Sequence, residues 1–83
     1  LEAFEEIDQR VVAMALRQLG ALAAGDAAAW RGVKQAKDMP QQVLMARIGI
    51  HHRLLFRGDA GELEVLDLVT RESLMTTLKR LRG

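Results

Sequence analysis

Basic side chains gather in the middle third of the chain, where they could bind phosphate groups. Residues 31–57 carry a net charge of +5, whereas residues 1–30 carry −3 and residues 58–83 carry −1. Such a block can attract phosphates although the whole chain has a net charge of only +1. The alternative is that these are ordinary solvated surface charges. The cations of the block are Arg31, Lys34, Lys37, Arg47, Arg53 and Arg57.

Two adjacent histidines, His51 and His52, lie inside this block and could transfer protons near neutral pH. In a strand their side chains would point to opposite faces, so we expect no shared metal site. The chain has no cysteine, which excludes disulfides and thiolate metal ligands. We therefore expect no metal and no cofactor.

Arg53 and Arg57 are four residues apart, so a strand would place both on the same face. They could bind phosphates there. Alternatively, they could pair with Glu62 or Glu64 across a hairpin, which would make their role structural. The only tryptophan, Trp30, could stack on a base, but a place in the core is favoured.

The first half of the sequence predicts helices. A short helix is expected over residues 1–7, and Asp8 is a suitable N-cap for a second helix from Gln9 to Ala24. Gly25 then predicts the end of this helix, and Asp26 predicts the N-cap of one further helical turn over residues 27–30. Apolar residues spaced by three or four predict the buried face of the second helix: Val12, Leu16, Leu19 and Ala23.

The second half predicts an antiparallel sheet. Residues 32–41 look irregular, and strands are expected over residues 43–48, 52–57 and 63–69, with a turn at 58–61. Short connections require antiparallel neighbours, so the hairpins run from about Ala46 to Thr70. Thr70 or Ser73 then caps a last helix. Its apolar stripe consists of Leu74, Leu78 and Leu81.

These elements define a single α+β domain over residues 1–83. Two N-terminal helices are expected on one face of a three-stranded antiparallel sheet, followed by a C-terminal helix. No apolar run approaches the ~20 residues of a membrane span, and no signal peptide opens the chain. We therefore expect a cytoplasmic protein with no membrane partner.

Six segments, taken together in this order, carry a resemblance to a known family. They are residues 25–26 (GD), 30–34 (WRGVK), 45–49 (MARIG), 52–57 (HRLLFR), 61–67 (GELEVLD) and 70–71 (TR). From about Leu1 to Leu81, the chain resembles the RelE/ParE superfamily of bacterial toxins from type II toxin–antitoxin modules. Members normally open with a strand before the first helix. The resemblance therefore implies a fourth strand that lies upstream of Leu1 or has been lost, and a lost strand would leave a sheet edge open.

The resemblance implies one of two activities. RelE-like members cut messenger RNA on the ribosome, and ParE-like members inhibit DNA gyrase without cutting nucleic acid; an antitoxin protein neutralises both. We expect RelE-like endoribonuclease activity, with ribosome-bound messenger RNA and a cognate antitoxin as partners. The alternatives are a gyrase-inhibiting or catalytically inactive binding module of the same fold, and a homo-oligomer joined through the open sheet edge.

RNA cleavage of the RelE kind attacks through the 2′-hydroxyl group, so it needs proton transfer and stabilisation of the phosphorane charge. Guanidinium groups suit the second task, because they stay charged and can bind two phosphate oxygens. By the resemblance, Arg53 matches the arginine of the family's tyrosine–arginine strand motif, and Arg71 matches the arginine after the last strand. The expected phosphate-binding residues are Arg47, Lys34, Lys37 and Arg57.

The chain departs from the family at positions that would move protons. It has no tyrosine, and Met75 or a neighbour stands where active members carry one near the start of the last helix. Met45 stands at a position that is basic in the family. His52 stands where a tyrosine is common, next to Arg53. His52 is therefore the expected proton-transfer group beside the catalytic Arg53 and Arg71, with the preceding histidine as the alternative.

Overall fold

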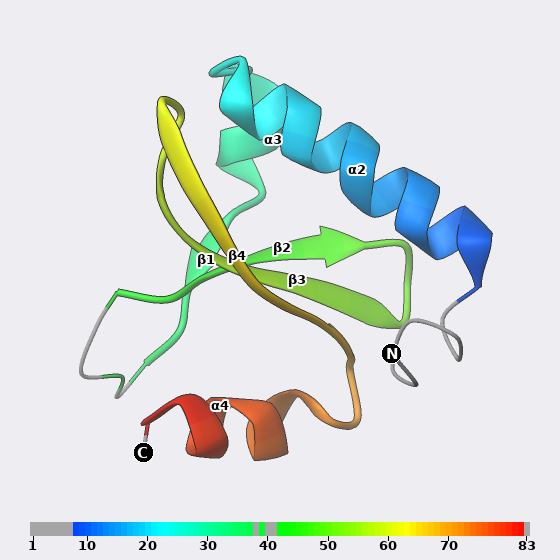
Figure 1. The fold of residues 1–83 in the computed structure, drawn as a ribbon, viewed down its shortest axis with the longest axis vertical. Coiled ribbons are helices and arrows are strands. Elements are labelled where there is room, and N and C mark those ends of the chain that lie inside the picture. Colours follow the sequence, from blue (N-terminus) through cyan, green and yellow to red (C-terminus); the bar gives the residue numbers. More distant parts are fainter. Residues whose placement is uncertain (1–7, 38, 40–41, 83) are drawn as a thin grey trace.

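The computed structural model describes residues 8–37, 39 and 42–82 of the chain. This part has an α+β fold with three helices and a four-stranded antiparallel sheet (Figure 1). The helices are α2 (Gln9–Ala23), α3 (Ala27–Arg31) and α4 (Leu74–Arg82). The strands are β1 (Lys34–Gln35), β2 (Leu44–Ile48), β3 (His52–Asp59) and β4 (Glu62–Thr70). The predicted α+β class with an antiparallel sheet is confirmed, whereas the helix predicted over residues 1–7 lies outside the described residues.

The strand order is β1-β2-β3-β4, so neighbours in the sheet are also consecutive in the sequence. β2 and β3 pair from Leu44 opposite Phe56 to Ile48 opposite His52. β4 pairs along the whole of β3, and a bulge leaves Leu66 without an opposite residue. The antiparallel pairing predicted from the short connections is therefore confirmed.

The expectation of three strands in this part of the chain is wrong, because residues 32–41 are not irregular throughout. Lys34 and Gln35 form β1, which pairs with Met45 and Leu44 at the edge of the sheet. A strand of two residues is too short to show the two-residue period by which strands are found in a sequence. The fourth strand of the described sheet therefore follows α3, and no described strand precedes α2.

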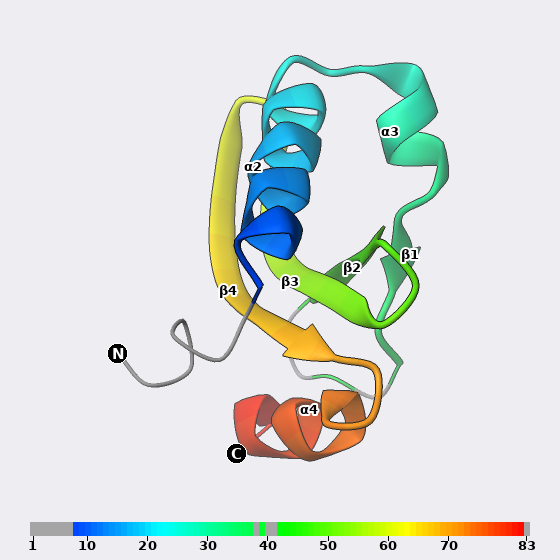
Figure 2. The same ribbon diagram turned by 90° about the vertical axis from the view of Figure 1, so that its right-hand side faces the viewer.

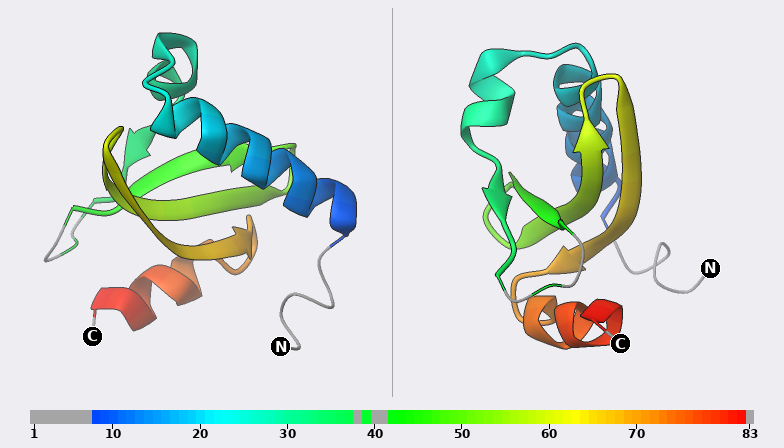
Figure 3. Two further views of the ribbon diagram at one scale, coloured as in Figure 1. Left: turned by 45° about the horizontal axis from the view of Figure 1, so that its top comes forward. Right: turned by 90° about the vertical axis from the view of Figure 1, so that its left-hand side faces the viewer.

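The predicted helix caps are confirmed. The carboxylate of Asp8 accepts a hydrogen bond from the Arg10 main-chain N–H at 2.8 Å, and that of Asp26 accepts one from Ala28 at 2.9 Å. Gly25 adopts a φ angle of 77° between the two helices. Figure 3 shows the tip of the β3–β4 hairpin near this connection, where Ala60 lies close to Gly25.

The predicted buried face of α2 is right only at Leu19, which packs against the core. Ala15 and Leu22 are buried, whereas Leu16 is 62% exposed. The helix has two apolar stripes at helical spacing, and spacing alone does not choose between them. The stripe that meets the sheet contains the small Ala15, which allows close approach. It consists of Val11, Ala15, Leu19 and Leu22.

Two clusters of apolar side chains lie on opposite faces of the sheet, one beneath α2 and the other against α4 (Figures 1 and 2). Leu54 and Phe56 belong to the cluster beneath α2, and Leu55 belongs to the other. The expected core position of Trp30 is confirmed, because its ring packs edge-on against the ring of Phe56, with the two ring centroids 5.9 Å apart. Its indole N–H donates to the carbonyl oxygen of Leu22 at 2.9 Å.

Two glycine substitutions should have opposite effects on stability. Gly20 lies within α2, and an added Cβ atom there would meet nothing within 4 Å. Gly20→Ala should raise the free energy of unfolding by about 0.5–1 kcal/mol, because alanine favours helix. Gly58 has a φ angle of 104°, and a Cβ atom there would overlap the carbonyl oxygen of Glu62. Gly58→Ala should lower the free energy of unfolding by more than about 1 kcal/mol.

Urea denaturation of the two variants and the parent chain measures both changes. A stability unchanged by Gly58→Ala would contradict the geometry of the β3–β4 hairpin, and a loss on Gly20→Ala would contradict the course of α2.

Candidate functional site

A hollow with a basic lining opens between the sheet and the start of α4, and we call it the basic hollow. Its volume is about 350 Å³. The lining holds three predicted site residues, one each from β1, β2 and β3, and no acidic side chain among the described residues. The full lining is Gly32, Lys34, Met45, Arg47, Arg53 and Leu74.

The register of the sheet places Arg47 and Arg53 directly opposite each other on β2 and β3. Both lie on the α4 face, because Leu54, next to Arg53, packs beneath α2. Lys34 is opposite Met45 and therefore shares this face. Like charges opposite one another destabilise a sheet. A bound anion would relieve this repulsion, so the arrangement suits a phosphate group.

Main-chain carbonyl groups hold Arg53 in place. Its Nη1 atom donates to the carbonyl oxygen of His52 at 2.8 Å and makes a longer contact with that of Ile50 at 3.5 Å. A guanidinium group has five N–H donors, and those on Nε and Nη2 have no acceptor among the described residues. Arg53 therefore has donors available for two oxygens of one phosphate.

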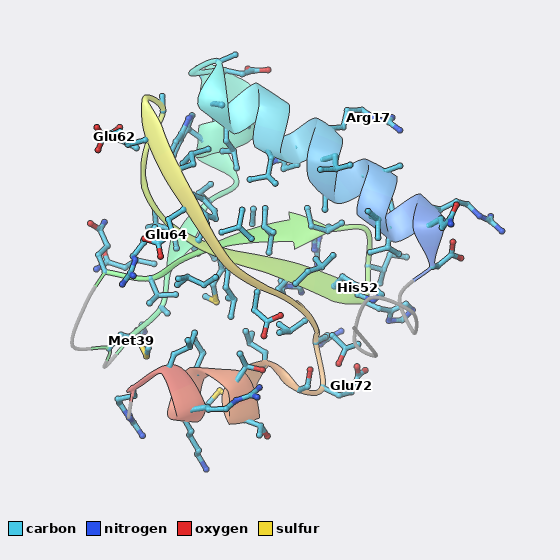
Figure 4. The ribbon with its side chains drawn as sticks, in the orientation of Figure 1. Arg17, Met39, His52, Glu62, Glu64 and Glu72 are labelled. Carbon is cyan, nitrogen blue, oxygen red and sulfur yellow. The ribbon has the colours of Figure 1, made fainter. Side chains whose placement is uncertain are left out.

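His52 does not join Arg53 in the basic hollow. It lies opposite Ile48 and Thr70 on the neighbouring strands, at the end of the sheet where β2 turns into β3 (Figure 4). Successive side chains of a strand point to opposite faces, so His52 is on the α2 face. The predicted proton-transfer residue and the predicted catalytic arginine are thus separated by the sheet.

Arg71 also lies outside the basic hollow. Its main-chain N–H donates to the carbonyl oxygen of His51 at 2.6 Å, just beyond the last paired residues of β3 and β4. The side chains of both residues are exposed. The structure therefore brings Arg71 to the β2–β3 turn, near His51, and not among the residues that line the hollow.

Arg57 forms an ion pair, as the structural alternative predicted. Its Nε and Nη2 atoms donate to the two carboxylate oxygens of Glu64, each at 3.0 Å. This hydrogen bonding, with the opposite charges, raises the pKa of Arg57 and lowers the pKa of Glu64. The pair lies near the tip of the β3–β4 hairpin, so Arg57 belongs to the hairpin and not to the basic hollow.

A second hollow of about 440 Å³ lies between β1 and α4, and we call it the basic-rimmed groove. Lys37 lines this groove, and Lys34 lines both hollows. Met39 lies beside α4 in Figure 4. The apolar lining is Ala36, Met39, Met45, Leu74, Met75 and Leu78. The polar lining is Lys34, Gln35, Lys37, Lys79 and Arg82.

A pattern in the sequence of α4 marks the residues that line this groove. Met75, Leu78, Lys79 and Arg82 follow the spacing i, i+3, i+4 and i+7, which places them on one face of α4. Gly32 and Leu74 carried no comparable signal for the basic hollow, because their place depends on how α3 and α4 meet the sheet.

The lining of the basic hollow can bind an anion but has no side chain suited to proton transfer at neutral pH. Its cations are one lysine and two arginines, and its other described lining residues, Gly32, Met45 and Leu74, carry no acid or base. Met75 is 64% exposed and lines the basic-rimmed groove instead. The geometry therefore supports charge stabilisation more than general acid–base chemistry.

In the part of the chain that the structure describes, no three His, Cys, Asp or Glu residues come together as a metal site would require. No described helix has the length and apolar character needed to cross a membrane. Comparisons with protein-family models, with curated proteins and with solved structures find no match to this chain. Its function is therefore inferred from its own residues.

Proposed function

We propose that the protein is a toxin of the RelE/ParE type that binds the phosphate backbone of messenger RNA in the basic hollow. The observation that carries this proposal is the direct opposition of Arg47 and Arg53 in a hollow with no acidic lining. The strands that hold these arginines are also the segments that resemble the toxin superfamily. The target would be ribosome-bound messenger RNA, which would place the action in the cytoplasm.

The two arginines suit the charge that develops when RNA is cut. The 2′-oxygen attacks the neighbouring phosphorus, a phosphorane with extra negative charge forms, and the bond to the 5′-oxygen breaks. Arg47 and Arg53, which are opposite each other in the sheet, would stabilise that charge more strongly than the charge of the ground-state phosphate. The proton of the 2′-hydroxyl would go to water or to a group supplied by the ribosome, and the departing 5′-oxygen would take up a proton from water or from such a group. The products are a 2′,3′-cyclic phosphate and a free 5′-hydroxyl.

A second candidate function is a binding module of the same fold that does not cut RNA. It is favoured by the position of His52 on the α2 face and by the absence of tyrosine from the chain. Such a module would either inhibit DNA gyrase or be a catalytically inactive relative. Both candidates use the basic hollow, and they differ in whether new RNA ends appear.

Arg53→Gln and Arg47→Gln should each weaken the binding of a labelled single-stranded RNA about tenfold at low salt, because each removes one charged phosphate contact. Each should also reduce the slope of log K against log salt by about 0.7. Fluorescence anisotropy over a range of salt concentrations measures both effects. Arg31→Gln is the matched control, since Arg31 is exposed and does not line the hollow.

Mapping of messenger RNA 5′ ends in a translation extract separates the two candidates. New ends that depend on Arg53 support cleavage, whereas RNA binding without new ends supports the binding module. A supercoiling assay with DNA gyrase then distinguishes a binding module that inhibits gyrase from a catalytically inactive relative. Equal binding by the parent chain and by the Arg53→Gln variant would contradict the proposal.

The basic-rimmed groove is the proposed surface for the antitoxin. Its apolar lining and its four cations, Lys34, Lys37, Lys79 and Arg82, complement an acidic amphipathic segment. Because Lys34 and Met45 line both hollows, a segment seated in the groove would also cover one wall of the basic hollow. Binding there would neutralise the toxin by blocking RNA.

The double variant Lys79→Glu with Arg82→Glu should bind the protein encoded by the adjacent reading frame at least about tenfold more weakly, because it turns attraction into repulsion. Isothermal titration calorimetry measures the affinity. Arg80→Glu is the control, as Arg80 is exposed on the same helix but does not line the groove. An equal loss in the control and in the double variant would argue against the groove as the contact surface.

A further inference from the structure

A third hollow lies between α2 and β2, and we call it the helix-side hollow. Its volume is about 380 Å³. Arg47 lines both this hollow and the basic hollow, so the two adjoin along β2. The other lining residues are Met14, Arg17, Gln18, Ala21, Ile48 and Gly49.

One stripe of α2 forms the wall of this hollow. Met14, Arg17, Gln18 and Ala21 are spaced i, i+3, i+4 and i+7, so they share one helix face. The methyl group of Met14 lies 3.3 Å from where a Cβ atom on Gly49 would be. This close approach fixes α2 beside the β2–β3 turn. Arg17, one helical turn later, also lines this hollow. Its exposed side chain extends from α2 into solvent, on the side away from the sheet in the view of Figure 4.

The edge of β2 between the two hollows is not covered by any strand of the described residues. β1 pairs with Leu44 and Met45 only, so the pairing stops before Ala46. The Val43 carbonyl accepts a hydrogen bond from Ala36, which shows that residues 43, 45 and 47 direct their main-chain groups toward the β1 side. The N–H group of Arg47 therefore points to this open edge, where no described residue accepts its hydrogen bond.

The charges along this edge have no acidic partners. Among the described residues neither Arg17 nor Arg47 forms an ion pair, whereas Arg10 lies 3.9 Å from Asp8. No acidic residue in the part of the chain that the structure describes lines either hollow. Gln18 adds an amide that can donate to a phosphate oxygen. The edge of β2 therefore has hydrogen-bond donors in both adjoining hollows, and no carboxylate of the described residues competes for them.

We infer that the two hollows form one track for single-stranded RNA, which crosses the uncovered edge of β2. One phosphate occupies the basic hollow, and the next phosphate along the strand binds Arg17, Gln18 and the Arg47 main-chain N–H. The inference rests on the proposed RNA binding and adds a second subsite to it. Arg17 is then a binding residue that neither the sequence analysis nor the family resemblance singled out.

The test compares RNA probes that differ in their number of phosphates. The full chain is titrated with a labelled dinucleotide, which has one internal phosphate, and with a labelled tetranucleotide, which has three. Arg17→Gln should weaken tetranucleotide binding about threefold to tenfold and reduce its salt slope by about 0.7, because one phosphate contact is lost. It should leave dinucleotide binding nearly unchanged, since that probe fills the basic hollow.

Arg31→Gln is the matched control, because it removes the same charge from an exposed helix position that lines neither hollow. Equal effects of Arg17→Gln and Arg31→Gln on the affinity for the tetranucleotide would overturn the track. If Arg53→Gln still lowers the affinity for RNA in that case, the proposed function stands. No RNA binding by the parent chain would overturn both. Thermal melting followed by circular dichroism checks that each variant is folded.

Discussion

The alternation of side chains along the paired strands β2 and β3 is the constraint on which the rest of the structure depends. Leu54, Leu55 and Phe56 are consecutive and all buried, which is possible only because the sheet is covered on both faces. Their burial fixes the register, since a shift of one residue would move every side chain of β3 to the other face. The positions of Arg47 and Arg53 follow directly from that register.

The same constraint determines which chemistry the chain can do. It brings two arginines together on the α4 face and sends His52 to the α2 face. A pair of like charges opposite each other is unfavourable in a sheet, and departures from such local rules concentrate at functional sites. The chain therefore gives up sheet stability at the place where an anion would be held. Under the proposed function it would gain charge stabilisation there, without an adjacent proton carrier among the described residues.

Much of the fold was predictable, because its signals are local. The caps at Asp8 and Asp26 and the three longer strands depend on residues that are close in the sequence. The short strand β1 and the buried stripe of α2 were not predictable, because both are decided by contacts with distant strands. Leu16 illustrates this, since it fits a helical stripe as well as Leu19 does but is exposed.

The candidate site was predictable only in its residue types. The basic block pointed to Lys34, Arg47 and Arg53, and the structure gathers these three in one hollow. The same block also contained Lys37, which lines the groove, and Arg57, which pairs with Glu64. Net charge does not distinguish these roles, because each is set by strand register and by the nearest acidic residue. Arg17, which lines the adjoining helix-side hollow and is proposed as a further binding residue, had no signal in the block because it is far from it in the sequence.

A double-mutant cycle on RNA binding with Arg47→Gln and Arg53→Gln tests the central claim most directly. If the two opposed arginines contact the same phosphate, the losses of binding free energy are not additive. The coupling should then be about 0.5 kcal/mol or more. Strictly additive losses would mean that the two arginines act independently, and the basic hollow would not be a single anion site.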